Sequence, residues 1–203
     1  MGNYLDGNCE FGKLTREIVN ACHDFACSKD ADIHSFFHEE FEDYSHQLLG
    51  KTYCFITKQG NKMVAAFTVA NSSIRVDNMP KSKRNKLNRK IPFSKQRSQY
   101  PAVLIGQLAV FDDFSGLDIG QEMMDFIKAW FIDPLNKTGC RYIIVDAINK
   151  EKVLQFYLDN GFDFIFTSSE EESQYMSKEE NVSNKEQYRE TRLMYFDLMK
   201  LVC

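Results

Sequence analysis

The feature that most constrains the fold is a nearly unbroken apolar run from Ala102 to Phe111. A strand that is covered on both faces of a sheet has such a run, whereas a half-exposed strand alternates apolar and polar residues. A second run, Tyr142 to Ala147, is apolar apart from Asp146. Each run precedes a segment with helical spacing, Gly120 to Phe131 and Lys150 to Leu158. Together they predict a sheet whose central strands are covered by helices.

Shorter elements flank these central strands. Residues 32–49 place apolar or aromatic side chains at three-to-four spacing, which predicts a helix with one buried face that ends at Gly50. Thr52 to Thr57 and Met63 to Ala70 enclose a short polar turn, Lys58 to Asn61, and predict an antiparallel hairpin. The remaining predicted strands are Phe162 to Thr167 and Leu193 to Leu201.

Length and composition favour one cytoplasmic domain. The chain has 203 residues and 43% hydrophobic content, which suits a single core and predicts one domain over residues 1–203. It has no apolar run of roughly eighteen residues, and Met1 to Phe11 does not resemble a secretory signal, so we expect neither a membrane span nor export. The cysteines form no Cys-x-x-Cys pair, which predicts reduced thiols and no metal site. They are Cys9, Cys22, Cys27, Cys54, Cys140 and Cys203.

Charge is distributed unevenly along the chain, although the net charge is only -4. A basic segment, residues 81–97, contains no acid and predicts either a solvated helix or a surface for nucleic acid. Its cations are Lys81, Lys83, Arg84, Lys86, Arg89, Lys90, Lys95 and Arg97. Residues 168–190 are rich in glutamate and predict a solvated acidic loop between two strands.

The segment between the first buried strand and its helix carries the clearest chemical signal. It reads Asp112-Asp113-Phe114-Ser115-Gly116-Leu117-Asp118-Ile119-Gly120. The first N–H groups of a helix lack partners within the helix and lie at the positive end of its dipole, and glycine lets the backbone approach an oxygen closely. The segment therefore predicts either a phosphate-binding loop over residues 114–120 or an ordinary tight turn. We refer to residues 114–120 as the glycine loop.

Three motifs in one order resemble the GNAT superfamily of N-acetyltransferases. They are Leu108-Ala109-Val110 at the end of the central strand, Ser115 to Gly120 as the Gln/Arg-x-x-Gly-x-Gly/Ala loop, and Phe156-Tyr157 with Gly161-Phe162 as the Phe-Tyr-x-x-x-Gly-Phe motif. The resemblance implies an α/β (α+β) fold, with a mixed, mostly antiparallel sheet of six to seven strands flanked by helices. It also implies a splayed central strand pair and an acyltransferase that uses acetyl-CoA as cosubstrate, without a metal.

The resemblance further implies a role for individual residues. Tyr157 stands at the position of the catalytic tyrosine, the general acid that protonates the CoA thiolate; a phenol with a pKa of about 10 and a thiol with a pKa of about 8.5 are matched closely enough. From its residue type alone, Tyr157 would be interpreted as a core aromatic. Asn149 stands near the position that holds the pantetheine arm. The other implied coenzyme-binding residues are Leu108, Ala109 and Val110 for the pantetheine, and Ser115, Gly116, Leu117, Asp118, Ile119 and Gly120 for the diphosphate.

The sequence departs from the family pattern at several positions. Ser115 replaces the usual Gln or Arg, and Asp118 replaces the first glycine of the loop. A carboxylate that points into the loop would repel a diphosphate, so we expect the Asp118 side chain to point to solvent. Gln107 on the central strand is neutral, which leaves Asp146 as the candidate general base; a strand-end cap is the alternative for Asp146.

A narrower resemblance runs from Phe25 to Leu201 and is to GNAT toxins that acetylate aminoacyl-tRNA. Phe25-Ala26-Cys27 followed by Ile33 to Phe37 is similar to their Phe-x-Cys, Leu-x-x-Phe-Leu opening. Pro101 to Val110 is similar to their pre-loop strand, with Gln107 in place of arginine. This resemblance implies tRNA as a partner, held by phosphate contacts from Lys81 to Arg97.

Three functions therefore remain open from the sequence. The first is transfer of the acetyl group of acetyl-CoA to a primary amine by direct attack, with Tyr157 as general acid. The second is the aminoacyl-tRNA-acetylating toxin, against which the acidic residues 168–190 count, because they would deter RNA. The third is a non-catalytic GNAT-fold module that binds a partner, which Asp118 favours. The amine acceptor, an antitoxin and a homodimer are left open as partners.

Overall fold

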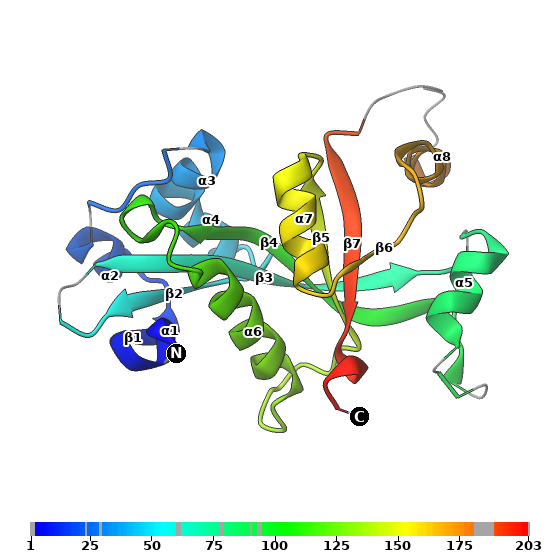
Figure 1. Cartoon of the computed structure of the whole chain (residues 1–203), viewed down its shortest axis with the longest axis horizontal. Helices are drawn as coiled ribbons and strands as arrows, with labels where there is room; N and C mark the ends of the chain where they lie inside the picture. The colour runs from blue at the N-terminus through cyan, green and yellow to red at the C-terminus, as the bar shows by residue number, and fades with distance from the viewer. Residues whose placement is uncertain are drawn as a thin grey trace. The chain divides into compact units, whose positions relative to one another are not determined.

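The computed structural model describes residues 3–22, 24–28, 30–59, 62–77, 79–89, 91–92, 95–180 and 189–202 (Figure 1). These residues belong to two compact units. The first unit comprises Met1–Ala70 and Ile105–Pro134, and the second comprises Asn71–Leu104 and Leu135–Cys203. Two long strands, β3 (Met63–Arg75) and β4 (Gln99–Val110), contribute residues to both units.

A sheet of seven strands is found among the described residues, hydrogen-bonded in the order β1-β2-β3-β4-β5-β7-β6. The other strands are β1 (Cys9–Lys13), β2 (Lys51–Thr57), β5 (Tyr142–Ile148), β6 (Asp163–Phe164) and β7 (Thr191–Asp197). Strands β1 and β2, β2 and β3, β5 and β7, and β6 and β7 pair antiparallel. A mixed α/β fold with a mostly antiparallel sheet is therefore confirmed, and the splay of a central strand pair stays a prediction.

Helices flank the strands in both units. The α-helices are α1 (Tyr4–Asn8), α2 (Arg16–Ala21), α3 (Ala31–Ser35), α4 (Phe41–His46), α5 (Lys81–Asn88), α6 (Ile119–Ile132), α7 (Glu151–Asp159) and α8 (Ser169–Glu180). The described residues also form a π-helical turn η1 (Phe36–Glu40) and the 3-10 turns η3 (Asp112–Phe114) and η4 (Leu198–Lys200). Local capping fixes several ends: the Thr15 and Asp30 side chains accept from the third amide of α2 and α3. Gly161, with a φ of 78°, follows the end of α7.

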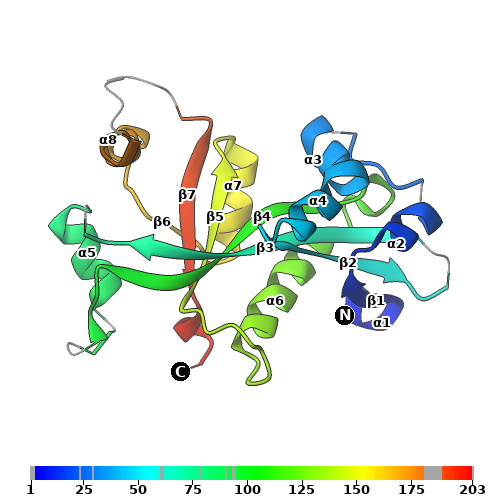
Figure 2. The ribbon, with the colours of Figure 1, turned by 180° about the vertical axis from the view of Figure 1, so that it is seen from behind.

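In the first unit, helices cover both faces of the strands (Figures 1 and 2). Helix α2, the π-helical turn η1 and helix α4 contribute Val19, Phe37 and Phe41 to one buried cluster, which contains Cys54 and Ala66 of the strands. Because successive strand residues point to opposite faces, Tyr53, Phe55 and Phe67 face the other way. There they pack against Phe126 and Trp130 of α6. This explains why residues 63–69 of β3 are all buried.

The second unit has its own core. Tyr142, Ile144 and Tyr195 of β5 and β7 pack with Leu87 of α5 and Tyr175 of α8. The Tyr142 hydroxyl donates to Leu87 O (3.3 Å). Beyond this cluster, the ring of Phe162, which follows α7, lies 5.6 Å from the ring of Phe196 of β7. The predicted strands 102–111 and 142–147 and the helices that follow them are confirmed as β4, β5, α6 and α7.

The predicted helix over residues 32–49 is interrupted. It forms as α3, the π-helical turn η1 and α4, and it ends at His46. In a π-helical turn one extra residue widens the coil and changes the hydrogen bonding of the carbonyls. Arg16 takes up this change by donating to His38 O (2.6 Å) and Glu39 O (3.4 Å). Periodicity alone could not reveal the interruption, because the guanidinium that stabilises it comes from α2.

The acidic segment is also different from the prediction, because residues 169–180 form helix α8 rather than a loop. Glu172 is buried (1% exposed). Its two carboxylate oxygens accept from Arg192 Nε and from the Leu193 amide, both at 2.8 Å. A glutamate-rich segment is predicted to be solvated on the basis of composition, and this ion pair with β7 is the reason that it packs instead. Residues 181–188 lie outside the described residues.

The closing strands are shorter than predicted. Strand β6 contains only Asp163 and Phe164, and β7 ends at Asp197 before η4. The Asp197 side chain accepts from the Met199 amide (3.1 Å) and also binds Arg141 (2.8 Å), which ends the strand and starts the turn. In the predicted hairpin turn, residues 60 and 61 lie outside the described residues.

Candidate active site

Near the end of β4, a backbone amide is hydrogen-bonded by a side chain of β3. The buried Thr68 side chain of β3 accepts from the Gln107 amide at 2.7 Å. A Cβ atom at Gly106 would lie 2.8 Å from the same hydroxyl oxygen, so a larger residue there would force the Thr68 side chain to shift. Ala109 is buried beneath α2 to α4, and Leu108 and Val110 are half-buried. No sequence signal pointed to Thr68, because threonine is common in strands.

The glycine loop leaves a row of backbone N–H groups unpaired. The Ser115 amide donates to Asp112 O at 3.1 Å, and the amides of Gln121 and Glu122 donate to Asp118 O at 3.0 and 3.2 Å. Between them, the amides of residues 116–120 donate to no acceptor within the part of the chain that the structure describes. Residues 115–118 are exposed. Unpaired amides at a helix N-terminus attract anions, and this loop therefore has the chemistry of an anion site.

Two residues of the loop have left-handed backbone geometry. Gly116 has a φ of 84° and Asp118 a φ of 57°. Asp118 is the N-cap residue of α6, its side chain makes no capping hydrogen bond, and it is exposed. Aspartate is among the few residues with a Cβ that adopt left-handed geometry readily, so it can replace glycine here without a change of backbone. The exposed carboxylate leaves the loop amides open.

Helix α6, which follows the loop, is anchored by buried side chains. Ile119, Met123 and Ile127 are at most 1% exposed. The Lys128 side chain is also buried and pairs with Asp125 at 3.2 Å. A helix anchored over this length gives a fixed direction to the amides at its start.

Tyr157 lies on α7, in the second unit, and its side chain is 9% exposed. Its ring contacts Phe156 and Phe162 edge-to-face, with centroids 5.2 and 5.4 Å away. Burial raises the pKa of Tyr157 to about 12. The hydroxyl has no hydrogen-bond partner among the described residues. It is therefore a protonated donor that the described part of the protein does not use.

Asn149 and Asp146 have different surroundings. The Asn149 side chain donates to Arg189 O at 3.0 Å, and its amide donates to Glu190 O at 2.7 Å. Asn149 thus holds the start of β7, a structural role that the sequence did not suggest. Asp146 is exposed on β5, opposite Leu193 of β7. Both residues belong to the second unit, whereas Leu108 to Val110 and the glycine loop belong to the first.

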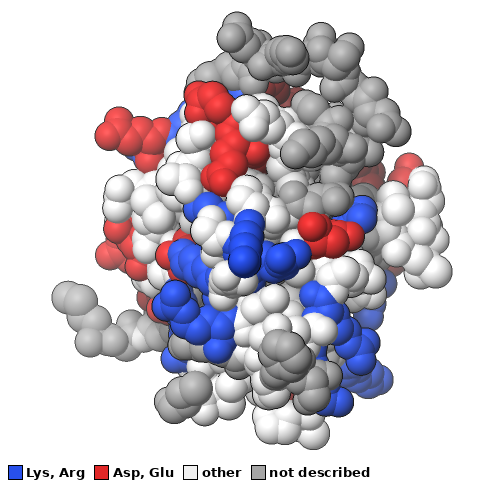
Figure 3. All heavy atoms as spheres, turned by 90° about the vertical axis from the view of Figure 1, so that its right-hand side faces the viewer, with Lys and Arg blue, Asp and Glu red and all other residues white. Residues whose placement is uncertain are grey.

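The basic segment forms α5 and the chain after it. Figure 3 views the face that carries α5 and α8 and shows Lys and Arg side chains gathered there. Lys83 donates to the Thr167 hydroxyl, and Lys86 lies 3.7 Å from Asp163. The other described cations of the segment have no acidic partner within the described chain: Lys81, Arg84, Arg89, Lys95 and Arg97. Lys90, which the sequence places in the segment, lies outside the described residues.

The described residues contain neither a metal-ligand cluster nor a membrane-spanning helix. No group of three or more His, Cys, Asp or Glu among them is arranged to hold a metal ion. No helix in the described part of the chain has the length and apolar content needed to cross a bilayer.

Comparison with known proteins identifies solved structures with the same fold. No protein-family model and no curated protein matches the sequence. The structures include a tyrosine-to-phenylalanine mutant of KacT, with a TM-score of 0.66 and 15% identity, covering 96% of this chain and 98% of that one. AtaT complexed with acetyl-methionyl-tRNAfMet gives a TM-score of 0.64 at 15% identity, covering 96% and 97%. AtaTR bound with AcCoA gives 0.63 at 14% identity, covering 96% of each. The predicted mixed α/β fold is thereby confirmed as the fold that these solved structures share.

Proposed function

We propose that the chain is an N-acetyltransferase that moves the acetyl group of acetyl-CoA to a primary amine. One observation carries the proposal: the unpaired amides of residues 116–120 stand at the start of α6, in a fold shared with a protein solved with AcCoA bound. A diphosphate would accept hydrogen bonds from these amides and gain from the helix dipole. On this proposal the backbone of Leu108 to Val110 pairs with the pantetheine arm.

The reaction requires one bond to form and one to break. The amine nitrogen attacks the thioester carbonyl, a C–N bond forms, and the C–S bond breaks. The sulfur leaves as a thiolate and takes a proton from the Tyr157 hydroxyl, which has no partner among the described residues. The attacking nitrogen loses its proton to solvent or to a base, for which Asp146 remains the candidate because its carboxylate is exposed.

The pKa of Tyr157 bears on this role. At about 12 it lies above the pKa of about 8.5 of a free thiol, so a proton transfer to a thiolate in water would be uphill. A thiolate that forms in the same buried surroundings also has a raised pKa, because burial disfavours its charge. The pKa values of the buried phenol and of the buried thiol are then close to each other again. The existence of a tyrosine-to-phenylalanine mutant of KacT supports the choice of a tyrosine as the residue to test.

A role for Asn149 in coenzyme binding has less support. Its side chain already donates to Arg189 O, which supports a structural role in fixing the start of β7. On this proposal Asn149 also contacts the pantetheine arm, because an asparagine side chain carries both N–H donors and a carbonyl acceptor.

Product analysis tests the proposal. The protein is incubated with acetyl-CoA and, separately, with small amines, peptides and aminoacyl-tRNA, and acetylated products are identified by mass spectrometry. The proposal expects an acetylated amine in at least one class and none when acetyl-CoA is omitted. If no class is acetylated and acetyl-CoA does not raise the melting temperature, the non-catalytic binding module is the better account.

The aminoacyl end of tRNA is the second candidate acceptor. It is favoured by the cations of α5 that have no acidic partner within the described chain, and by the complex of AtaT with acetyl-methionyl-tRNAfMet. Single cations spaced along a helix contact phosphates and give affinity without sequence readout.

A triple substitution tests this candidate. Replacing Lys81, Arg84 and Arg89 by Ala should weaken tRNA binding and flatten its salt dependence by about 0.7 to 0.9 in log–log slope for each phosphate that the variant no longer neutralises. We choose these residues because Lys83 and Lys86 are engaged by Thr167 and Asp163. The readout is tRNA affinity at several salt concentrations.

The control removes the same charge elsewhere. Lys13, Lys51 and Lys137 are exposed and lie outside the basic segment. If their replacement by Ala lowers affinity and slope as much as the α5 variant does, the effect is one of net charge and α5 is not the tRNA surface.

A further inference from the structure

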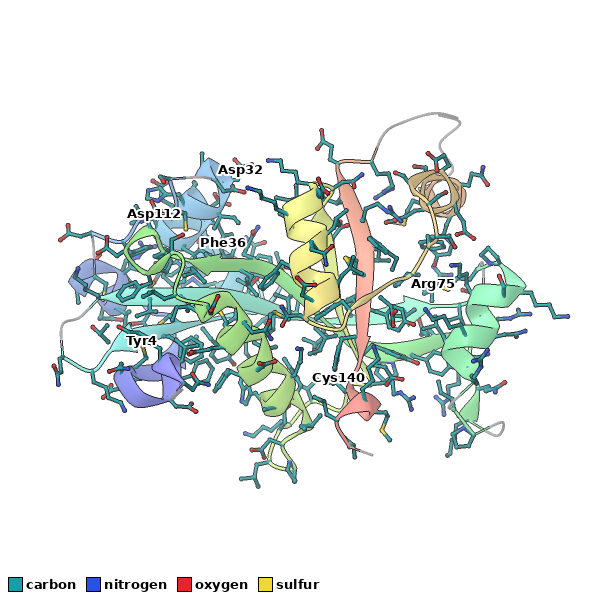
Figure 4. The ribbon with its side chains drawn as sticks, viewed as in Figure 1. Tyr4, Asp32, Phe36, Arg75, Asp112 and Cys140 are labelled. Carbon is teal, nitrogen blue, oxygen red and sulfur yellow. The ribbon has the colours of Figure 1, made fainter. Side chains whose placement is uncertain are left out.

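The N-terminal segment contacts both ends of the glycine loop. The Tyr4 ring lies 6.1 Å from the ring of Phe114, at the beginning of the loop. Glu122, in the first turn of α6 just after the loop, accepts from the Tyr4 amide at 3.0 Å and from the Leu5 amide at 2.9 Å, one bond to each carboxylate oxygen. Figure 4 shows Tyr4 on α1, beside α6. All of these residues belong to the first unit.

The segment that makes these contacts is itself fixed. Leu5 is 3% exposed, and the Asn3 side chain accepts from its amide at 3.1 Å. At the other end of α1, Lys58 of the hairpin donates to Asp6 O and Gly7 O at 3.2 and 3.0 Å. The chain then continues directly into β1, which pairs with β2. Helix α1 is therefore tied to the sheet and can hold the loop against it.

We propose that α1 acts as a clamp on the coenzyme loop, with Glu122 and Tyr4 as positioning residues for acetyl-CoA. The inference rests on the proposed function, since the ligand of the loop is taken to be the diphosphate of acetyl-CoA. A loop with two left-handed residues and unpaired amides has few internal bonds to fix its shape. Contacts at both of its ends reduce the freedom that binding would otherwise have to remove.

The hydrogen bonds from α1 to Glu122 also reduce an unfavourable effect of its negative charge. A carboxylate in the first turn of α6 would compete with an anionic ligand for the positive end of the helix. Both oxygens of Glu122 are instead occupied by amides of α1. Hydrogen bonds to a charged acceptor are about twice as strong as neutral ones, so they hold this carboxylate on α1.

The test compares three variants with a matched control. Glu122→Ala removes both acceptors and the charge, Glu122→Gln removes the charge but keeps one acceptor, and Tyr4→Ala removes the ring contact. Glu10→Ala removes an exposed carboxylate of β1, at a residue paired with Ile56 of β2. Two quantities are measured: the Kd of acetyl-CoA, and hydrogen exchange at the Gln121 amide, which donates to Asp118 O at the start of α6.

The clamp predicts that Glu122→Ala and Tyr4→Ala raise the Kd of acetyl-CoA by roughly tenfold, a change that corresponds to about 1.4 kcal/mol. It also predicts faster exchange at Gln121 without acetyl-CoA, a smaller effect in Glu122→Gln, no change in Glu10→Ala, and an unchanged kcat at saturating coenzyme. Tighter acetyl-CoA binding in both Glu122 variants would show that Glu122 acts only through its charge, and this would overturn the clamp. Unchanged exchange at the Gln121 amide would overturn it as well. If the unaltered protein does not bind acetyl-CoA, the proposed function fails, while the exchange measurement still decides on the clamp.

Discussion

Tyr157→Phe is expected to lower kcat by about 10²- to 10⁴-fold and to leave the Kd of acetyl-CoA nearly unchanged. The hydroxyl is needed only when the thiolate forms, and the described part of the protein gives it no other partner. The phenylalanine ring keeps the edge-to-face contacts with Phe156 and Phe162. The measurements are steady-state kinetics with the acceptor found by product analysis, and calorimetric titration with acetyl-CoA.

Two further results separate catalysis from structure. Tyr53→Phe, in the aromatic cluster under α6, removes a hydroxyl from a half-buried tyrosine and should leave kcat unchanged. With a pKa of about 12, Tyr157 stays protonated in neutral and mildly alkaline solution, so kcat should show no loss from its ionisation there. A Tyr157→Phe enzyme that loses acetyl-CoA binding and turnover to the same extent would assign the residue a structural role.

Glu172→Ala is expected to destabilise the fold by about 3 to 5 kcal/mol, because it leaves Arg192 buried without its partner. The two side chains are 1% and 10% exposed and lie 2.8 Å apart. Arg189 lies 3.9 Å from the same carboxylate, and the substitution removes this neighbour as well. Chemical denaturation followed by circular dichroism measures the change in the free energy of unfolding.

Two other variants show whether the ion pair itself causes that destabilisation. Glu170→Ala, two residues earlier on the exposed side of α8, should change the free energy of unfolding little. The double variant Glu172→Leu with Arg192→Met should recover much of the stability, because an apolar pair of similar volume can replace a buried ion pair. A small effect of Glu172→Ala alone would mean that α8 does not depend on this pair for packing.

The parts of the fold that were predicted from sequence follow from local patterns. The continuous apolar run of β4 and the helical spacing after it are local properties, and both elements formed where they were expected. The glycine loop was predicted for the same reason. Asp118 has left-handed backbone geometry, which aspartate adopts readily, and the coenzyme-binding role of the loop stays a prediction.

The features that were missed depend on partners far away in the sequence. The π-helical turn needs Arg16, and the packed acidic helix needs Arg192, which is 20 residues away from Glu172. The hydrogen bond between Glu122 and Tyr4 spans 118 residues. Composition alone suggests that charged residues such as Arg16, Glu172 and Glu122 lie on the surface. Their partners come together only when the chain folds.

Backbone nuclear magnetic resonance during a titration with acetyl-CoA shows whether the glycine loop binds the coenzyme diphosphate, because it observes the loop amides one by one. Binding of the diphosphate by the loop should shift the amide signals of Gly116, Leu117, Ile119 and Gly120 most, with saturation, whereas S-acetylpantetheine, which lacks the diphosphate, should leave them nearly unmoved. Signals that stay in place at millimolar acetyl-CoA, or that respond equally to S-acetylpantetheine, would contradict it.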